Sequence, residues 1–454
     1  MFFTHDRAFY KRLAVLMITL ALQNLIAYSV NMADNIMLGS YSQTTLSGAA
    51  TVNQIFFMIQ QLALGIGDSL VILGSQYWGR GEIGQIRKLA GIALKFTMAC
   101  CLVIFLLCAL FPSQLLALFT TEAAIIEEGV SYLRIVKYSF LLFLVTNCLM
   151  SALRCVEIVR ISFVISVISL LTNVSINYLL IFGKLGCPEL GIQGAAIGTL
   201  VARGLELVVI LLYVVKKDRK LRLFSENIFR RNPQLAADYR KTAIPTVLTE
   251  LLWGVSVPMQ TGILGHLTAD AIAANSVAST FYSYLKVVVR ALASASAVLI
   301  GAAIGEGNMT AVKEKARTIA VAGVSVGAVM GLLLFALRTP LLSCYRLNEN
   351  ALMLADQMMI LYSFIMVAMG FQMTICNGVI RAGGDVRFTT ALNLLSVWAI
   401  VIPVSFLCAF VWKVPIMVTV LAVQSDQIFK GIPVVIRLRT YRWIRKLTRS
   451  EEKA

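Results

Sequence analysis

The chain has 454 residues, of which 59% are hydrophobic and 14% charged, and its mean hydropathy is +0.81. Soluble domains contain about 45–50% apolar and about 25% charged residues, so this composition excludes a soluble globular protein and predicts that lipid surrounds most of the chain. The net charge of +17 would suggest nucleic-acid binding on a soluble domain, but cytoplasmic loops of a membrane protein also collect basic residues.

Six segments in the first half are long and apolar enough to span a membrane as helices, which takes about 20 mostly apolar residues. The first segment contains Asn31 and Asp34, and no small-residue cleavage site follows it. We therefore expect a retained helix rather than a signal peptide. The six expected helices are 13–37, 46–76, 89–111, 130–153, 161–182 and 190–215.

A polar and basic stretch, 216–241, separates these helices from six more apolar segments. We expect a cytoplasmic linker between an N-terminal lobe, 1–215, and a C-terminal lobe, 242–436, followed by a basic cytoplasmic tail, 437–454. The predicted fold is an all-α integral membrane protein with twelve transmembrane helices in two six-helix bundles. The expected helices of the second lobe are 242–264, 271–304, 316–337, 357–380, 388–411 and 414–436.

The distribution of lysine and arginine predicts the orientation of these helices. Of the 40 basic residues, 29 lie in segments on the same side as the N-terminus, 4 lie in loops on the opposite side and 7 lie within expected helices. Because basic residues collect in cytoplasmic loops, both termini are expected in the cytoplasm. This distribution also accounts for the net charge without a nucleic-acid partner.

The two halves of the chain repeat each other. A shift of 226 residues places Gly79–Gly81 on Gly305–Gly307, and a shift of 227 places Arg154 on Arg381. Each half has an even number of expected helices, so both halves cross the membrane in the same direction. This predicts a parallel repeat related by a pseudo-twofold axis along the membrane normal, with a cleft between two lobes that can rock against each other.

Several short runs resemble the multidrug and toxic compound extrusion family. Their order, spacing and duplication carry the resemblance, which covers nearly the whole chain. The matching positions are Asn31–Gly39, Leu46–Gly48, Gln76–Gly81, Asn173, Asn177, Gly183, Leu190–Ala196, Ile380–Asp385, Trp398, Pro403 and Trp443.

This resemblance implies secondary active export of organic, often cationic and amphipathic, compounds in exchange for protons or sodium by alternating access. It further implies a monomer in the plasma membrane of a bacterium, with small-molecule substrates and membrane lipid as its only partners. No cofactor and no enzymatic activity are expected, and the coupling ion is left open between H⁺ and Na⁺.

Asp34 is the first candidate for ion coupling. A charged side chain at mid-bilayer costs about 2.5–3.5 kcal/mol on insertion scales, so an ionisable residue inside a predicted helix is a functional candidate. By resemblance, Asp34 matches the family's aspartate in the first helix, and Asn173 or Asn177 matches its partner. The four-residue spacing places both asparagines on one helix face. The alternative is a helix-end carboxylate bonded only to local amides.

Glu250 is the second candidate, and the resemblance assigns it to ion or substrate handling. Pro245 and Pro258 on either side should free backbone carbonyls that could ligate a cation, so a sodium ion could bind at Asp34 or at Glu250. The expected helix 357–380 has no acidic residue. This argues against a complete sodium site of the kind found in the family's sodium-coupled branch.

Other charged residues in the expected helices have structural interpretations. Arg203 with Glu206, and Asp426 with Lys430, have the spacing of intrahelical ion pairs. Lys286 and Arg290 could pair with an acidic group or extend to the membrane interface. Asp68 follows two glycines and could cap a helix bend.

A substrate cavity is expected to be lined by polar, aromatic and methionine side chains, because such residues adapt to varied organic compounds. The polar candidates are Asn31, Gln54, Asp68 and Lys286. The apolar and aromatic candidates are Phe56, Phe57, Phe140, Met259, Phe281 and Tyr282.

Two other functions were weighed. A flippase for a lipid-linked saccharide or related polyprenyl lipid would need a basic cavity, which Lys95, Lys286 and Arg290 could supply. A membrane-embedded enzyme would rest on the Ser-x-x-Lys spacing of Ser283 and Lys286 alone. Only two histidines are present, and the glycine motifs are too short for a phosphate-binding loop. A disulfide between Cys187 and Cys344, both in expected outside loops, is left open.

The repeat is broken at the candidate ion sites. With the 226-residue shift, Asp34 falls opposite Gln260 and Glu250 falls opposite Asn24. Each half thus holds a carboxylate where the other holds an amide. We therefore expect the lobes to differ in role, with ion exchange centred on Asp34 and a separable contribution from Glu250.

Overall fold

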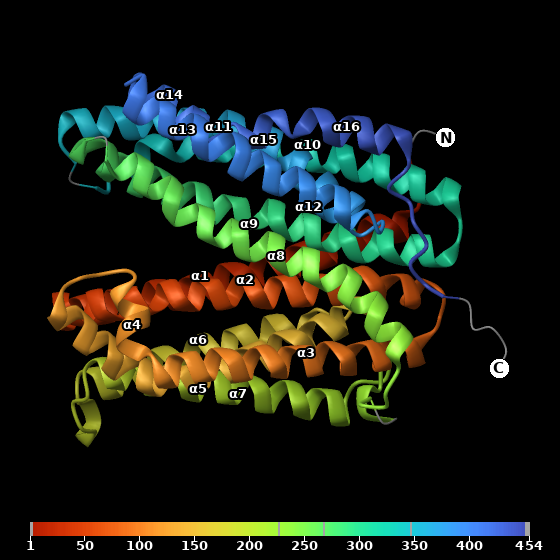
Figure 1. Ribbon diagram of the computed structural model, residues 1–454, viewed down its shortest axis with the longest axis horizontal. Helices are drawn as coiled ribbons and strands as arrows, with labels where there is room; N and C mark the ends of the chain where they lie inside the picture. Colours follow the sequence, from red (N-terminus) through yellow and green to blue (C-terminus); the bar gives the residue numbers. More distant parts are fainter. Residues whose placement is uncertain (1–2, 226–227, 267, 346, 450–454) are drawn as a thin grey trace. The chain divides into compact units, whose positions relative to one another are not determined.

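A computed structural model describes residues 3–225, 228–266, 268–345 and 347–449, and every regular element in these residues is a helix. Within these residues, eleven helices are long and apolar enough to cross a membrane. The predicted class, an all-α membrane protein, is confirmed. The first nine are α1 (Arg7–Tyr41), α2 (Gln43–Gly79), α3 (Ile83–Leu110), α5 (Ala123–Cys155), α6 (Arg160–Ile181), α7 (Ile192–Lys216), α8 (Pro233–Gly265), α9 (Ala269–Glu306) and α10 (Met309–Leu342) (Figure 1).

The tenth and eleventh spans contain π-helical turns. Glu349–Ile380 consists of α11 (Glu349–Met373) and η3 (Thr374–Ile380). Val386–Val411 consists of α12 (Val386–Leu394), η4 (Leu395–Val401), α13 (Ile402–Phe406) and η5 (Leu407–Val411). Pro403 lacks an N–H group, and its ring would collide with a carbonyl one turn earlier in a regular α-helix. The wider turn directly before it accommodates the ring.

The last expected span, 414–436, is helical but interrupted. It forms α14 (Ile416–Gln424), α15 (Asp426–Phe429) and α16 (Gly431–Thr440). Gly431 weakens the helix, and Pro433 is tolerated only in the first turn of a helix, so the chain restarts there as α16. The twelfth expected helix is thus built from three short helices. The remaining short elements are α4 (Pro112–Ala117), η1 (Lys184–Gly186) and η2 (Leu223–Ser225).

Several helices begin earlier than expected because a polar side chain caps them. Thr268, Asn308 and Asn348 each accept a hydrogen bond from the backbone N–H three residues later, at 2.8–3.1 Å. Such caps satisfy N–H groups that have no partner within the helix. The cap at Asn348 places the start of α11 eight residues before the expected boundary.

The described chain forms two compact units. The N-half unit comprises Leu22–Leu70 and Glu82–Ala243, and the C-half unit comprises Met1–Ala21, Val71–Gly81 and Ile244–Ala454. Helices α1 and α2 therefore contribute to both units. These boundaries follow compactness, whereas the expected lobes follow the sequence repeat, and the division into lobes at the linker stays a prediction.

The expected linker packs against α3 inside the N-half unit. Arg87 donates to the carbonyl of Leu221 at 2.7 Å, and Lys95 donates to the carbonyl of Phe229 at 2.7 Å. Leu221 and Leu223 are fully buried. The last part of 216–241 belongs to α8, which begins at Pro233.

Within the C-half unit, α2 and α9 cross with their backbones in contact. A Cβ atom on Gly79 would overlap the carbonyl of Ala302, and one on Gly305 would overlap the carbonyl of Gln76. The 226-residue shift relates Gly79 to Gly305 and Gln76 to Ala302. The shift therefore maps one contact, between Gly79 and Ala302, onto the other, between Gly305 and Gln76, as in a twofold contact.

The expected basic tail is held in place by the same part of the C-half unit. Gln76 donates to the carbonyls of Ala382 and Arg445 at 3.3 Å and accepts from the N–H of Leu447 at 2.9 Å. Trp443 is fully buried. Asp385, 1% exposed, pairs with Arg437 and with Arg445. In Figure 1 the chain after α16 runs along the ends of neighbouring helices toward the C-terminus.

Candidate ion site and its counterpart

The N-half unit brings three of the four expected ion-coupling residues together. Asp34 projects from α1, and Asn173 and Asn177 project from one face of α6. Asn177 Nδ2 donates to Asp34 Oδ1 at 2.6 Å and lies 3.3 Å from Asn173 Oδ1. Asn173 Nδ2 donates in turn to Thr199 Oγ1 on α7 at 3.4 Å. A chain of polar groups thus connects α1, α6 and α7 in an apolar surrounding.

Asn177 fits this position because α7 carries Gly198 beside it. A Cβ atom on Gly198 would overlap Asn177 Oδ1. That oxygen is buried and accepts no hydrogen bond within the described part of the chain. A buried acceptor without a partner costs about 1–3 kcal/mol, so the site holds an unused oxygen next to a carboxylate.

A small cavity opens beside Asp34. Its volume is about 20 Å³, enough for one water molecule or one small ion but not for an organic compound. Five of its lining residues carry no signal in the sequence, because only the assembled helices bring them to the site: Asn53, Tyr132, Ser139, Ser169 and Thr199. The lining residues are Val30, Asn31, Asp34, Val52, Asn53, Phe56, Tyr132, Val136, Ser139, Phe140, Ser169, Asn173, Thr199, Ala202 and Arg203.

Arg203 lines the same cavity, but its charge is already balanced. Its Nη1 lies 2.9 and 3.0 Å from the two carboxylate oxygens of Glu206, which confirms the predicted pair. The guanidinium also lies 4.8 Å from the ring centroid of Phe143 and 5.7 Å from that of Phe56. Asp34 is therefore bonded to an amide, whereas the neighbouring cation is held by another carboxylate.

Glu250 has a different environment in the C-half unit. Its Oε1 lies 2.8 Å from Arg381 Nη1, and its Oε2 lies 3.7 Å from Arg290 Nη2. Glu250 is 8% exposed and Arg381 is 2% exposed. The expected helix 357–380 ends just before Arg381, and no pattern in the sequence pointed to this contact. The repeat-equivalent residue, Arg154, lies 3.9 Å from Asp68 in the N-half unit.

The MatE family model matches residues 19–179 and 245–407, and the second match begins 226 residues after the first. The chain belongs to the MatE family. The same interval that the repeat predicted thus separates two copies of one family domain.

Similar proteins and structures agree with this MatE assignment. The chain is 26% identical over 404 residues to "Probable multidrug resistance protein NorM" of Rhizobium meliloti, covering 86% of this chain and 83% of that protein. It is 22% identical over 366 residues to "Probable multidrug resistance protein YoeA" of Bacillus subtilis, covering 80% and 79%. The bent form of the Vibrio cholerae MATE transporter VcmN has the same fold, with a TM-score of 0.84 at 18% identity, covering 95% and 97%.

One expectation about this MatE chain is wrong. The tenth expected helix was taken to begin at residue 357 and to lack an acidic residue. Because Asn348 caps α11 earlier, the helix contains Glu349 and Asp356. Asp356 Oδ1 lies 3.0 Å from Arg338 Nε, so this carboxylate is already paired.

The expected substrate-cavity residues are not all brought together. Asn31, Phe56 and Phe140 line the small cavity beside Asp34, whereas Gln54 is exposed on α2. Tyr282 belongs to the core of the C-half unit, where its ring lies 4.7 Å from that of Tyr362.

The other cavity candidates have separate surroundings. Phe281 packs edge-on against Tyr345 with their ring centroids 6.1 Å apart. Met259 is 42% exposed, and Phe57 is half-buried. Lys286 lies beside the rings of Trp253 and Tyr282. The predicted pair of Asp426 and Lys430 is confirmed at 2.7 Å.

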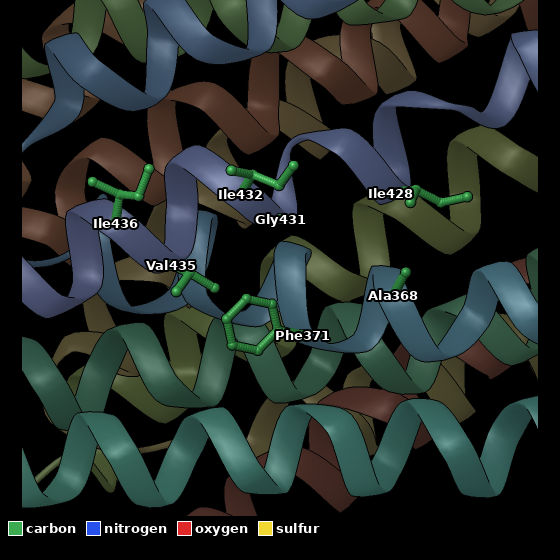
Figure 2. Close-up of a pocket in the computed structure, with 7 residues that line it drawn as sticks. All are labelled: Ala368, Phe371, Ile428, Gly431, Ile432, Val435 and Ile436. Carbon is green, nitrogen blue, oxygen red and sulfur yellow. The ribbon is translucent and has the colours of Figure 1, made fainter.

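A larger hollow in this MatE protein lies between α11 and the α15–α16 segment. It has a volume of about 410 Å³, and every side chain around it is a hydrocarbon (Figure 2). Without a polar group it offers no recognition of an ion or a charged compound, so it is part of the apolar surface. Its lining residues are Ala368, Phe371, Ile428, Gly431, Ile432, Val435 and Ile436.

Neither a metal cluster nor a disulfide occurs in the ranges that the structure describes. No group of three or more His, Cys, Asp or Glu side chains could hold a metal ion there. All nine cysteines are free thiols, including Cys187 and Cys344, whose pairing the sequence left open.

Proposed function

We propose that this chain is a secondary active antiporter that exports organic compounds in exchange for a proton or a sodium ion by alternating access. The observation that carries the proposal is the Asp34 carboxylate, held by buried amides next to a cavity the size of one ion. A bilayer-buried carboxylate with amide rather than cationic partners has free capacity for a cation.

The hydrogen bond between Asn177 and Asp34 gives this exchange a mechanical consequence. A hydrogen bond to an ionised carboxylate is roughly twice as strong as one between neutral groups. A proton or sodium ion on Asp34 therefore loosens the contact between α1 and α6, and loss of that ion tightens it. Ion occupancy would thereby select between two positions of α1. Antiport requires such a link between ion binding and protein conformation, because the ion and the substrate move in opposite directions.

The substrate class comes from the relatives. Their names include multidrug resistance proteins, which favours amphipathic small organic compounds for this chain too. We further propose a monomer in the plasma membrane of a bacterium, with both termini in the cytoplasm, since the basic residues gather on one side. Reporter fusions at either terminus test this orientation, and activity of a periplasm-dependent reporter at the C-terminus would contradict it.

Transport by purified protein in proteoliposomes tests the function and its coupling ion together. With a fluorescent organic cation and separate pH and sodium gradients, we expect uphill transport with one gradient. Asp34→Asn should reduce it by at least about 10-fold, the effect of losing a charge-assisted interaction. Glu127→Gln, at an exposed carboxylate on α5, is the matched control and should transport normally. Unchanged transport by Asp34→Asn would show that Asp34 has no coupling role.

The flippase alternative has weaker support. Of the three cations it would need, Lys95 donates to the carbonyl of Phe229 within the N-half unit, whereas Lys286 and Arg290 belong to the C-half unit. Translocation of a labelled polyprenyl-linked saccharide in the same vesicles, without export of organic cations, would favour the flippase over the antiporter.

A further inference from the structure

The apolar hollow of the C-half unit lies beside the interrupted last span. One wall is α11, through Ala368 and Phe371, and the other is the α15–α16 segment. In Figure 2 the side chains of Phe371 and Val435 point toward each other across the space between these helices. Gly431 contributes no side chain, and a Cβ atom there would meet nothing within 4 Å. The break in the last span at Gly431 therefore leaves unfilled volume beside α11.

Only hydrocarbon suits this hollow as an occupant. Its volume, about 410 Å³, falls in the range of about 300–1,000 Å³ that is typical of sites for small molecules. Folded proteins contain few voids larger than a water molecule, because the lining atoms of an empty void lose their contacts. A bound water needs about two to four polar partners, and every side chain around the hollow is a hydrocarbon. In a membrane-spanning segment, a lipid acyl chain meets these conditions.

The hollow also has the length of one acyl chain. Ile428, Ile432 and Ile436 border it at intervals of four residues and are 49%, 68% and 59% exposed. Arg439 lies on the same helix face, three residues beyond Ile436 in the last turn of α16. At about 1.5 Å per residue, Ile428 and Arg439 are about 16 Å apart along the helix, close to half of a hydrocarbon core about 30 Å thick. The isoleucine row thus spans one leaflet, and Arg439 lies at the level of the lipid phosphates.

The end of α16 has the character of a membrane–water interface. Tyr441 directly follows the helix, and its hydroxyl accepts hydrogen bonds from Arg317 at 2.6 and 3.0 Å. Tyrosine is enriched where the bilayer core meets water. Arg439 is exposed and makes no ion pair or hydrogen bond within the described ranges of the chain, whereas Arg437 is held by Asp385. The donors of Arg439 are therefore available to an anion outside the protein.

We propose that the hollow holds one acyl chain of an anionic phospholipid whose phosphate is bound by Arg439. A guanidinium can donate two parallel hydrogen bonds to a phosphate, and an arginine without a counter-ion favours a lipid with a net negative charge over a zwitterionic one. The bound chain takes the place of the side chain that Gly431 lacks and stabilises the interrupted span against α11. With both termini in the cytoplasm, this lipid belongs to the inner leaflet.

Native mass spectrometry of the detergent-purified full-length chain tests the headgroup contact. The protein is titrated with phosphatidylglycerol and with phosphatidylcholine of identical acyl chains. We expect one phosphatidylglycerol molecule to bind about 10-fold more tightly than phosphatidylcholine, the effect of one charge-assisted interaction. Arg439→Gln should remove this preference and leave phosphatidylcholine nearly unchanged. Arg160→Gln is the matched control, because Arg160 is also an exposed arginine at a helix end without a partner in the described ranges.

Filling the hollow should weaken binding of both lipids, whatever their headgroup. Gly431→Leu places a side chain in the open space, and Ala368→Phe fills the same hollow from α11 without touching the helix break. Gly204→Leu on α7 is the control, since a Cβ atom there also meets nothing within 4 Å. Thermal unfolding in the same detergent shows that each variant is folded. Added phosphatidylglycerol should raise the thermal midpoint of the unmodified protein but not that of the two filled variants.

The proposal is overturned if the unmodified protein binds the two lipids equally, or if Arg439→Gln binds phosphatidylglycerol as tightly as Arg160→Gln does. Retention of the lipid by both filled variants would also overturn it. Displacement of the lipid by a transported organic cation, equally in the unmodified protein and in Arg439→Gln, would assign the hollow to substrate instead. None of these measurements involves transport, so their outcome is independent of the proposed antiport.

Discussion

At the scale of single residues, the polar chain from Asp34 to Thr199 depends on one position that carries no functional group. Gly198 leaves the space that Asn177 needs in order to reach Asp34. A side chain there would displace the amide without altering any charge. A mutation at Gly198 can therefore change the geometry of the site without changing its charged or polar groups.

We expect Gly198→Val to reduce ion-coupled transport by about 10-fold, because the Asn177 amide can no longer support the carboxylate. Gly204→Val on the same helix is the control, since a Cβ atom there meets nothing within 4 Å. Transport rates and thermal midpoints of both variants in the same membrane preparation check this. Equal rates for the two would show that Asn177 does not support Asp34.

Glu250 should behave differently from Asp34, because it neutralises two arginines. Removing one partner of a buried ion pair typically costs about 3–5 kcal/mol, since the other charge is left uncompensated. We therefore expect Glu250→Gln to lower the thermal midpoint clearly, while Asp34→Asn leaves it nearly unchanged. A thermostability assay on detergent-purified protein measures both. A midpoint unaffected by Glu250→Gln would favour an ion-handling role over a structural one.

Sequence reasoning found the Asp34 site because a carboxylate and two asparagines stand out in apolar segments. It could not find that Arg381 pairs with Glu250, because 131 residues separate them and only the assembled helices bring them together. Arg381 falls at the end of an apolar segment, where a cation is ordinarily solvated.

At the scale of elements, hydropathy located each of the long apolar helices but misjudged their ends and missed short ones such as α4. The expected segments contain only the apolar part of each helix, whereas caps such as Asn348 extend α11 into polar sequence. For this reason Asp356 was assigned to a loop. The interrupted last segment was also missed, because a hydropathy window averages over Gly431 and Pro433.

The crossing of α2 and α9 requires glycine on both sides. We expect Gly79→Ala and Gly305→Ala each to lower the stability of the protein by about 1–3 kcal/mol, the usual effect of forcing a methyl group into a packed contact. Gly84→Ala is the control, because its surroundings are open. Thermal unfolding followed by tryptophan fluorescence measures the difference. If both variants had the thermal midpoint of the wild-type protein, the α2–α9 crossing would accommodate the added methyl groups without loss of stability, and the prediction would be wrong.

At the scale of the whole molecule, the C-terminal segment acts as part of the fold rather than as a free tail. Gln76, Gly383 and Asp385 all bond to residues between Arg437 and Leu447. We expect truncation after Thr440 to lower the thermal midpoint, because the buried Gln76 amide loses two of its three bonds and the buried Asp385 carboxylate loses one of its two arginines. Truncation after Arg449 is the control. Unchanged unfolding of the shorter chain would show that the segment contributes no stability.

The twofold contact between α2 and α9 has a consequence for the origin of the chain. The contact of Gly79 with Ala302 and the contact of Gly305 with Gln76 are equivalent under the repeat. A protein half as long could therefore make the same contact with a second copy of itself. One glycine codon would then have served both sides of the crossing. Fusion of two such genes would preserve this contact and free the rest to diverge, which is consistent with Asp34 in one half and Gln260 at the equivalent position of the other. In this view, one duplication accounts both for the chemical difference between the halves and for the symmetric contact between α2 and α9.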